Sequence, residues 1–435
     1  MLERFLTSIR CYFLNEIIKD PKTINKDSSI VFFLINLSKQ CFRNEYSWSQ
    51  TKGEIDKINK LYDKMLMKIN TGERIFDCEI LILSSYKILN EFEVLKDYLI
   101  NNDNHKTIFK VIKRQILDYE YEKKLKNRIS SLTKIKNKIS LKVRNQYESN
   151  PYPRWDDKRK NIPKNYIDIV RQSILPNHLP DEFFKNKTEI KNILIAGCGT
   201  GYHPIELALS DPNIEIDAID LSLSSLAYGK RKAEEMHVEN INWIHADILE
   251  LDNIKKKYDA IESVGVIHHL ENPKDGFDSL TNKLKKHGIL KLGLYSRNVR
   301  EELKIAKEMI STLKDMEDLT KIRNAREIIA NSDNIKMQYP MKFSDFFATS
   351  EFRDLLMHEQ EKDFNLLEVK ELINDHYKFL GFVINDRNSG SIRSNYRNNF
   401  PDDTTMTNLE YWNDFEASIP NLFNAMYQFY LYKNN

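Results

Sequence analysis

The sequence has few cysteines, little net charge and no long apolar run. Its 435 residues carry 66 basic and 64 acidic side chains, a formal net charge of +2, which gives no overall attraction to nucleic acid. Its four cysteines are widely spaced and form no pair with the spacing of a zinc site. Because it has neither a secretory signal nor an apolar run of about 18 residues, we expect a cytoplasmic protein that does not bind membranes.

What the sequence does contain is a βαβ pattern with a glycine-rich turn. The apolar run Ile193–Ala196 predicts a buried parallel strand, and it ends in Gly197-Cys198-Gly199-Thr200-Gly201. A helical segment follows, and then a second strand, residues 214–219, ends in Asp220. Glycines let the backbone approach a ligand, and an acid at the next strand end binds a ribose diol. The pattern therefore predicts a nucleoside site.

The glycine spacing selects the ligand class. Dinucleotide sites use G-x-G-x-x-G, which would need glycine at position 202, where Tyr202 stands. The chain has G-x-G-x-G instead, at Gly197, Gly199 and Gly201. Cys198 stands where a small side chain is needed, and we interpret it as a packing residue. A tight turn that binds no ligand is the alternative interpretation.

Further strands are predicted at regular spacing after this unit. They are expected at 242–246, in the first part of 258–270, at 289–295, at 380–385 and at 426–432, with a helix over 408–425 between the last two. Parallel strands alternating with helices indicate an α/β fold with a doubly wound parallel sheet.

Several motifs together resemble one bacterial family of S-adenosylmethionine (SAM)-dependent class I methyltransferases, often joined to tetratricopeptide repeats. The matching segments are QYE-NPYPRW (146–155), AGCGTG-HPIE (196–206), DLS--SLAY-KRK (220–232), GV-HHL--P (265–273), LGLYS (292–296), TSE-RDLL-H-QE (349–361), FPDD--MT (400–407) and FE---P--F--MYQF (415–429). The resemblance covers nearly the whole chain, although the repeat array itself is absent. It implies a Rossmann-like class I sheet with a terminal antiparallel pair, and SAM as the cofactor.

The resemblance also implies roles for individual residues. The loop 197–201, with Gly197, Cys198, Gly199, Thr200 and Gly201, would surround the methionyl part of SAM. Asp220 would bind the ribose with Leu221 beside it, Asp247 would accept from the adenine amino group with Ile248 flanking the ring, and Gly265 with Val266 would line the floor near the sulfur. One departure is Ile195, since many relatives have an acid two residues before the first glycine.

His268 and His269 follow the fourth predicted strand, near the expected reacting centre. An imidazole there could take a proton from the methyl acceptor, or it could only orient the loop. Tyr295 and Arg297 are further base or acceptor-orienting candidates. Two adjacent histidines without an i, i+4 partner or a nearby cysteine or aspartate cluster do not predict a metal site.

The segment 146–155 is dense in aromatic residues and proline. Pro151 and Pro153 favour an extended path. We interpret the segment as a lid over the donor site, with Tyr147 or Arg154 near the methionyl carboxylate. The alternative interpretation is an aromatic contact that packs a helical domain onto the sheet.

We expect four regions along the chain. A helical N-terminal domain would cover 1–145, with apolar residues at helical spacing in 1–18, 28–44, 52–70 and 79–99. The SAM-binding core with its lid would cover 146–297, a helical cap would be inserted at 298–378, and 379–435 would complete the core. Within the first region, 106–144 is basic, which would suit an RNA-binding helix. Its apolar residues at core-like spacing and its few aromatic residues favour a solvated linker helix instead.

The sequence therefore predicts methyl transfer from SAM to an unidentified acceptor, either a small molecule or a protein. A SAM-binding regulatory or scaffold protein is the alternative, and an RNA methyltransferase is a third and less favoured interpretation. The sequence predicts neither the acceptor nor the oligomeric state.

Overall fold

The computed structural model describes residues 2–156, 163–175, 189–313, 316, 318–384, 386–419, 422, 423 and 425–434. The chain divides into two compact units. One combines the N-terminal residues through Lys124 with Ile305–Met357, and the other combines Leu125–Lys304 with His358–Asn435. We call them the helical unit and the sheet unit.

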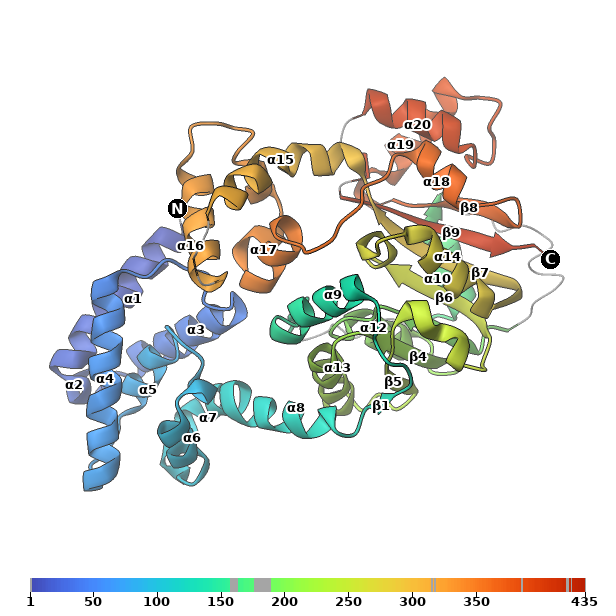
Figure 1. The fold of residues 1–435 in the computed structure, drawn as a ribbon. Coiled ribbons are helices and arrows are strands. Elements are labelled where there is room, and N and C mark those ends of the chain that lie inside the picture. The colour runs from blue at the N-terminus through green and yellow to red at the C-terminus, as the bar shows by residue number, and fades with distance from the viewer. Residues whose placement is uncertain are drawn as a thin grey trace. The chain divides into compact units, whose positions relative to one another are not determined.

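The sheet unit is built on a sheet whose nine described strands have the order β1-β5-β4-β3-β6-β7-β9-β8-β2 (Figure 1). The strands are β1 (Ser130–Ser131), β2 (Ile174–Leu175), β3 (Asn192–Ala196), β4 (Glu215–Asp220), β5 (Ile241–His245), β6 (Tyr258–Val264), β7 (Leu284–Tyr295), β8 (Tyr377–Val383) and β9 (Met426–Lys433). Neighbours from β1 to β7 are parallel, whereas β9 is antiparallel to both β7 and β8. This confirms the predicted doubly wound sheet with a terminal antiparallel pair; the two-residue edge strands β1 and β2 were not predicted.

Helices cover both faces of this sheet. The helices of the sheet unit are α9 (Lys138–Ser149), α10 (Tyr166–Ser173), α12 (Tyr202–Ser210), α13 (Leu223–Glu235), α14 (Pro273–Lys283), α18 (Leu366–Leu372), α19 (Asp386–Asn399) and α20 (Leu409–Ser418). Side chains of α10, α12 and α13 form one core layer, and those of α14, α18, α19 and α20 form the other. Strands β3 and β4 supply side chains to both layers, as expected for strands buried on both faces.

The helical unit has its own apolar core. Its helices are α1 (Leu2–Lys19), α2 (Pro21–Lys26), α3 (Ser28–Arg43), α4 (Lys52–Thr71), α5 (Asp77–Leu83), α6 (Glu93–Ile100), α7 (Phe109–Ile112), most of α8 (Asp118–Lys126), the second half of α15 (Arg297–Thr312), α16 (Asp318–Asn331) and α17 (Thr349–Leu356). The segment 79–99 does not form the single expected helix. Helix α5 ends before Ser84 and Ser85, whose hydroxyls donate to the Leu81 carbonyl and provide a local alternative to continued helix.

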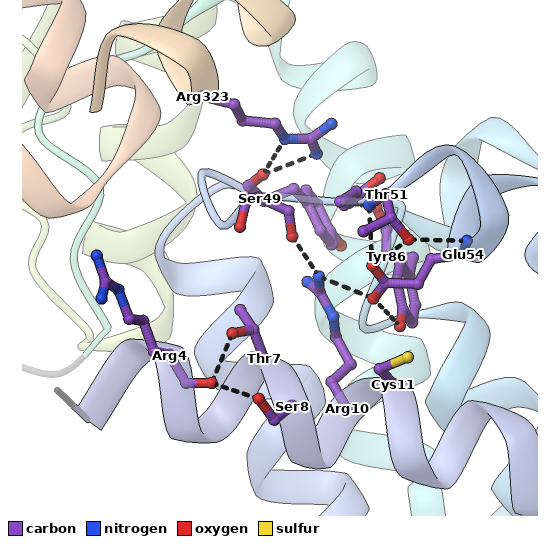
Figure 2. A network of polar contacts seen from close by, with 12 residues as sticks. Arg4, Thr7, Ser8, Arg10, Cys11, Ser49, Thr51, Glu54, Tyr86 and Arg323 are labelled. Atoms are coloured by element: carbon purple, nitrogen blue, oxygen red, sulfur yellow. Dashed lines mark hydrogen bonds and ion pairs between the residues drawn. The ribbon is translucent and has the colours of Figure 1, made fainter. Parts of the chain in front are cut away.

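A buried polar network fixes the loop between α3 and α4 (Figure 2). The Arg10 guanidinium donates to the Ser49 carbonyl at 2.8 Å and lies 4.1 Å from the centre of the Tyr86 ring. Tyr86 donates at 2.7 Å to Glu54, whose other oxygen accepts from the Thr51 backbone at 2.8 Å and caps α4. The network replaces part of the water that these buried polar groups lose on folding.

The segment Ile305–Met357 belongs to the helical unit. Arg323 donates twice to the Tyr46 carbonyl, at 3.0 and 2.8 Å, and Thr349 donates to the Glu45 carbonyl at 2.9 Å. These boundaries differ from the cap that we expected over 298–378, because 358–378 groups with the sheet instead. Within the described ranges, no helix has the length and apolar character needed to cross a bilayer.

Candidate functional site

The glycine loop is formed by backbone conformations that other residues rarely adopt. Gly197, Gly199 and Gly201 have φ values of 76°, 52° and 80°, in the left-handed region that costs glycine little. A Cβ added to Gly199 would lie 2.8 Å from the Tyr152 carbonyl oxygen. The amides of Gly197 and Cys198 both donate to the Ile219 carbonyl, at 2.9 and 3.0 Å. The loop is therefore tied to the end of β4.

Asp220 at the end of β4 is bonded directly to this loop. One carboxylate oxygen accepts from the Gly199 amide and the other from the Ser222 amide, both at 2.8 Å. Burial raises the pKa of Asp220 to about 6, more than these two hydrogen bonds lower it. Leu221 follows, and its carbonyl accepts from His245 Nε2 at 3.0 Å. The carboxylate thus lies at the strand end where the sequence places it. One of its oxygens bonds to the glycine loop and the other to the turn after β4.

Asp247, after β5, has an unused acceptor atom. Its Oδ1 accepts from the Leu249 amide at 3.0 Å, and its own amide donates to Thr133 Oγ1 at 2.9 Å. Its Oδ2 is buried, and no donor in the described part of the chain reaches it. Ile248 beside it is buried as well. A buried carboxylate oxygen without a donor is costly, so this atom is suited to a ligand N–H.

Gly265 and Val266 follow β6 and lie close to the glycine loop. Gly265 has φ 77°, and a Cβ added to Gly197 would overlap the Val266 side chain. Because the carboxyl ends of parallel strands share one edge, the ends of β3, β4, β5 and β6 bring the predicted loop, Asp220, Asp247 and Gly265 together.

The predicted lid packs against the same loop. The Thr200 hydroxyl donates to the Pro153 carbonyl, and Trp155 Nε1 donates to the Thr200 carbonyl at 3.2 Å. Arg154 lies between these two contacts in the chain. Trp155 also packs edge-on against Tyr228 on α13, at 6.2 Å between ring centres. These contacts all lie within the sheet unit, so the alternative, packing of a helical domain onto the sheet, stays a prediction.

Glu148 contacts the turn after Asp220, and our sequence analysis did not name it. It lies on α9, beside Tyr147, and one carboxylate oxygen accepts from the Ser224 amide at 3.0 Å and the Ser222 hydroxyl at 3.1 Å. The other oxygen pairs with Lys126 at 2.7 Å. These bonds fix α9 to the turn that follows Asp220. An acid inside the QYE-NPYPRW motif was the available signal.

The side chains of His269 and His358 both form hydrogen bonds with the backbone of Gln360. His269 Nδ1 lies 2.8 Å from the Gln360 carbonyl, so it carries the hydrogen and leaves Nε2 as the acceptor. The Gln360 amide donates to His358 Nδ1 at 3.1 Å, and the two rings stack 3.6 Å apart. Burial, followed by the charges of His268 and His358, lowers the pKa of His269 well below its usual value. His269 is therefore a neutral imidazole with a defined tautomer.

His268 and Tyr295 form the neighbouring part of this cluster. Their rings lie 3.9 Å apart, and the Arg300 guanidinium lies 3.5 Å from the Tyr295 ring centre. Burial, then Arg300, lowers the pKa of His268 well below its usual value. Tyr147 Oη lies 3.1 Å from His358 Nε2, which links the lid to the cluster.

Arg297 is directed elsewhere. Its guanidinium pairs with Asp363 at 2.9 Å and with Glu368 at 2.6 Å. Acidic partners therefore already bind the side chain that we expected to orient an acceptor.

The chain is similar in sequence to known methyltransferases. Residues 187–344 match a family described as "Methyltransferase domain". The chain is 30% identical over 198 residues to malonyl-[acyl-carrier protein] O-methyltransferase 2 of Ilyobacter polytropus, with 42% of this chain and 75% of that protein aligned. It is 32% identical over 206 residues to an uncharacterized Synechococcus protein, across 45% of this chain and 49% of that protein, so it spans about half the length of that relative.

Solved structures with a similar fold include PKMT2 from Rickettsia typhi in complex with AdoHcy. The TM-score is 0.45 at 16% identity, over 66% of this chain and 55% of that one. The N-methyltransferase NodS from Bradyrhizobium japonicum, bound to S-adenosyl-L-homocysteine (SAH), is also similar (TM-score 0.27, 18% identity, 38% and 76% of the two chains). From the sheet order, the match to the methyltransferase domain and the Ilyobacter relative, the chain belongs to the class I SAM-dependent methyltransferases.

Proposed function

We propose that the sheet unit binds SAM at the edge formed by β3, β4, β5 and β6. Asp220 would accept from the ribose hydroxyls, because its carboxylate is already held in place by two backbone amides. Asp247 Oδ2 would accept from the adenine amino group, because it is buried and lacks a donor among the described residues. The loop 197–201 would lie along the methionyl part, and Tyr147 and Arg154 would approach it from the lid.

The donor supplies an activated methyl group on a sulfonium, so the protein contributes mainly positioning and exclusion of water. We propose that His269 takes the proton of the acceptor. The observation that carries this role is the Gln360 peptide, which fixes Nδ1–H and leaves a neutral Nε2 lone pair. His268 and Tyr295 would hold the imidazole in place through ring contacts of 4.3 and 5.6 Å.

A neutral base favours an acceptor that has a proton to lose. Hydroxyl, thiol and amine groups meet that condition, on either a small molecule or a protein. The name of the Ilyobacter relative makes malonyl-acyl-carrier protein a further acceptor to test.

The test is conversion of SAM to SAH by purified protein, assayed with fractionated lysate and with malonyl-acyl-carrier protein. Turnover that requires one fraction would support the enzyme and identify the acceptor's source. SAH binding without turnover in any fraction would favour the alternative, a SAM-binding regulatory protein.

Replacement of His269 by alanine should lower kcat by about 10²- to 10⁴-fold, the usual contribution of general base catalysis. The Kd for SAH should stay within about twofold, because His269 donates to Gln360 and not to the glycine loop. His376→Ala, at an exposed turn before β8, is the matched control and should leave both quantities unchanged. An unchanged kcat in His269→Ala would show that His269 is not the base.

A further inference from the structure

A row of polar side chains crosses the sheet next to the donor loop. Glu262 on β6 is paired in register with Ile195 on β3 and with Lys291 on β7, and Lys291 is paired with Tyr430 on β9. Glu262 is only 2% exposed. A charged side chain this deeply buried needs several hydrogen-bonding or oppositely charged partners.

Each oxygen of the Glu262 carboxylate has a defined partner. Oε1 accepts from the Tyr166 hydroxyl at 2.8 Å, and Oε2 lies 2.7 Å from His203 Nε2 and 3.5 Å from Lys291 Nζ. Burial by itself would raise the pKa of Glu262, but Lys291, His203 and Tyr166 hold it well below its usual range. The carboxylate is therefore ionised, and its oxygens are occupied within the protein.

His203 is the accessible end of this row. It is the second residue of α12, which begins directly after Gly201, and its side chain is 38% exposed while Glu262 is buried. A carboxylate can only accept, so His203 Nε2 carries the hydrogen. In the neutral ring Nδ1 is then an acceptor, and the carboxylate behind the ring strengthens it, as carboxylates do for metal-bound histidines.

We propose that His203 binds the ammonium group of the donor's methionyl tail and that Glu262 is the positioning residue that orients it. The tail must lie along the loop that α12 follows, where β3 supplies only the apolar Ile195 and no acid. An ammonium has three hydrogens and needs acceptors. His203 supplies one at the edge of the loop, and Glu262 fixes its tautomer. This assignment rests on the proposed donor site.

The test distinguishes binding of the methionyl tail from binding of the nucleoside. Calorimetry would compare SAH, its deaminated analogue and 5′-methylthioadenosine, which lacks the whole amino-acid tail, on wild type and His203→Ala. SAH should bind His203→Ala about tenfold more weakly than wild type, whereas the two ligands without the amino group should bind both proteins equally. His376→Ala is the control for loss of an exposed histidine.

Two further variants keep the proposal falsifiable. His203→Gln, whose amide can donate to Glu262 while its oxygen accepts, should recover part of the lost SAH affinity. Glu262→Gln should weaken SAH and spare 5′-methylthioadenosine; should it fail to fold, the His203 variants decide.

Equal losses for all three ligands, or no loss for any of them, would overturn the role of His203 and leave the donor site intact. Failure of wild type to bind SAH at all would instead remove the donor site on which the role depends.

Discussion

Replacing Asp220 with alanine is expected to weaken SAH binding by at least about 100-fold. The carboxylate would lose its bonds to the ribose, and each hydrogen bond to a charged group contributes about 1.5–3 kcal/mol. The Gly199 and Ser222 amides, both 2.8 Å from the carboxylate, would lose their acceptor as well. Titration calorimetry with SAH measures the effect.

Asp252→Ala is the matched control, because Asp252 lies in the same unit with a fully exposed side chain. Its affinity for SAH should equal that of wild type. A folded Asp220→Ala protein with wild-type affinity would mean that the ribose is bound elsewhere.

SAH affinity should also fall in acid. Burial raises the pKa of Asp220 to about 6, and the protonated acid has lost the charge that strengthens its bonds to the ribose. Affinity should be level above about pH 7 and should fall by up to about tenfold per pH unit below about pH 6. The pH dependence of folding stability has the opposite direction. Because the pKa of Asp220 is raised on folding, its protonation stabilises the folded state at low pH, and that contribution is lost as the pH rises through 6. Calorimetry between pH 5 and pH 8 measures the first trend; a flat profile would contradict the assignment.

The second large effect is expected in the helical unit. Arg326 is buried, pairs through both terminal nitrogens with Glu3 at 3.1 and 2.8 Å, and donates to the Ser47 and Phe346 carbonyls at 2.7 and 2.9 Å. Arg326→Met would leave the Ser47 and Phe346 carbonyls without this buried donor and would remove the ion pair of the partly buried Glu3. We expect a loss of about 3–5 kcal/mol in the free energy of unfolding of this unit, measured by urea denaturation.

Hydrogen exchange should localise this loss. Amides in the segments 44–50 and 318–356 should exchange faster in Arg326→Met, because the side chain joins them. Glu327→Met changes an exposed neighbour on the same helix and should alter neither exchange nor stability. Equal behaviour of the two variants would show that Arg326 does not hold the segment.

The sequence alone determined the sheet and its donor loop, because both follow local rules. Apolar runs of strand length, the glycine spacing and Asp220 at a strand end are readable from neighbouring residues. The structure has β3, β4 and the loop between them where these patterns predict them. The terminal antiparallel pair was predicted in the same way.

Tertiary structure decided what depends on pairing across distance. That Glu262 lies opposite Ile195 is a matter of strand register. The tautomer of His269 depends on Gln360, which lies about 90 residues away in sequence. The segment Ile305–Met357 belongs to the helical unit because Arg323 and Arg326 reach backbone carbonyls in the loop after α3. Backbone carbonyls carry no residue identity, so no sequence pattern could have indicated these partners.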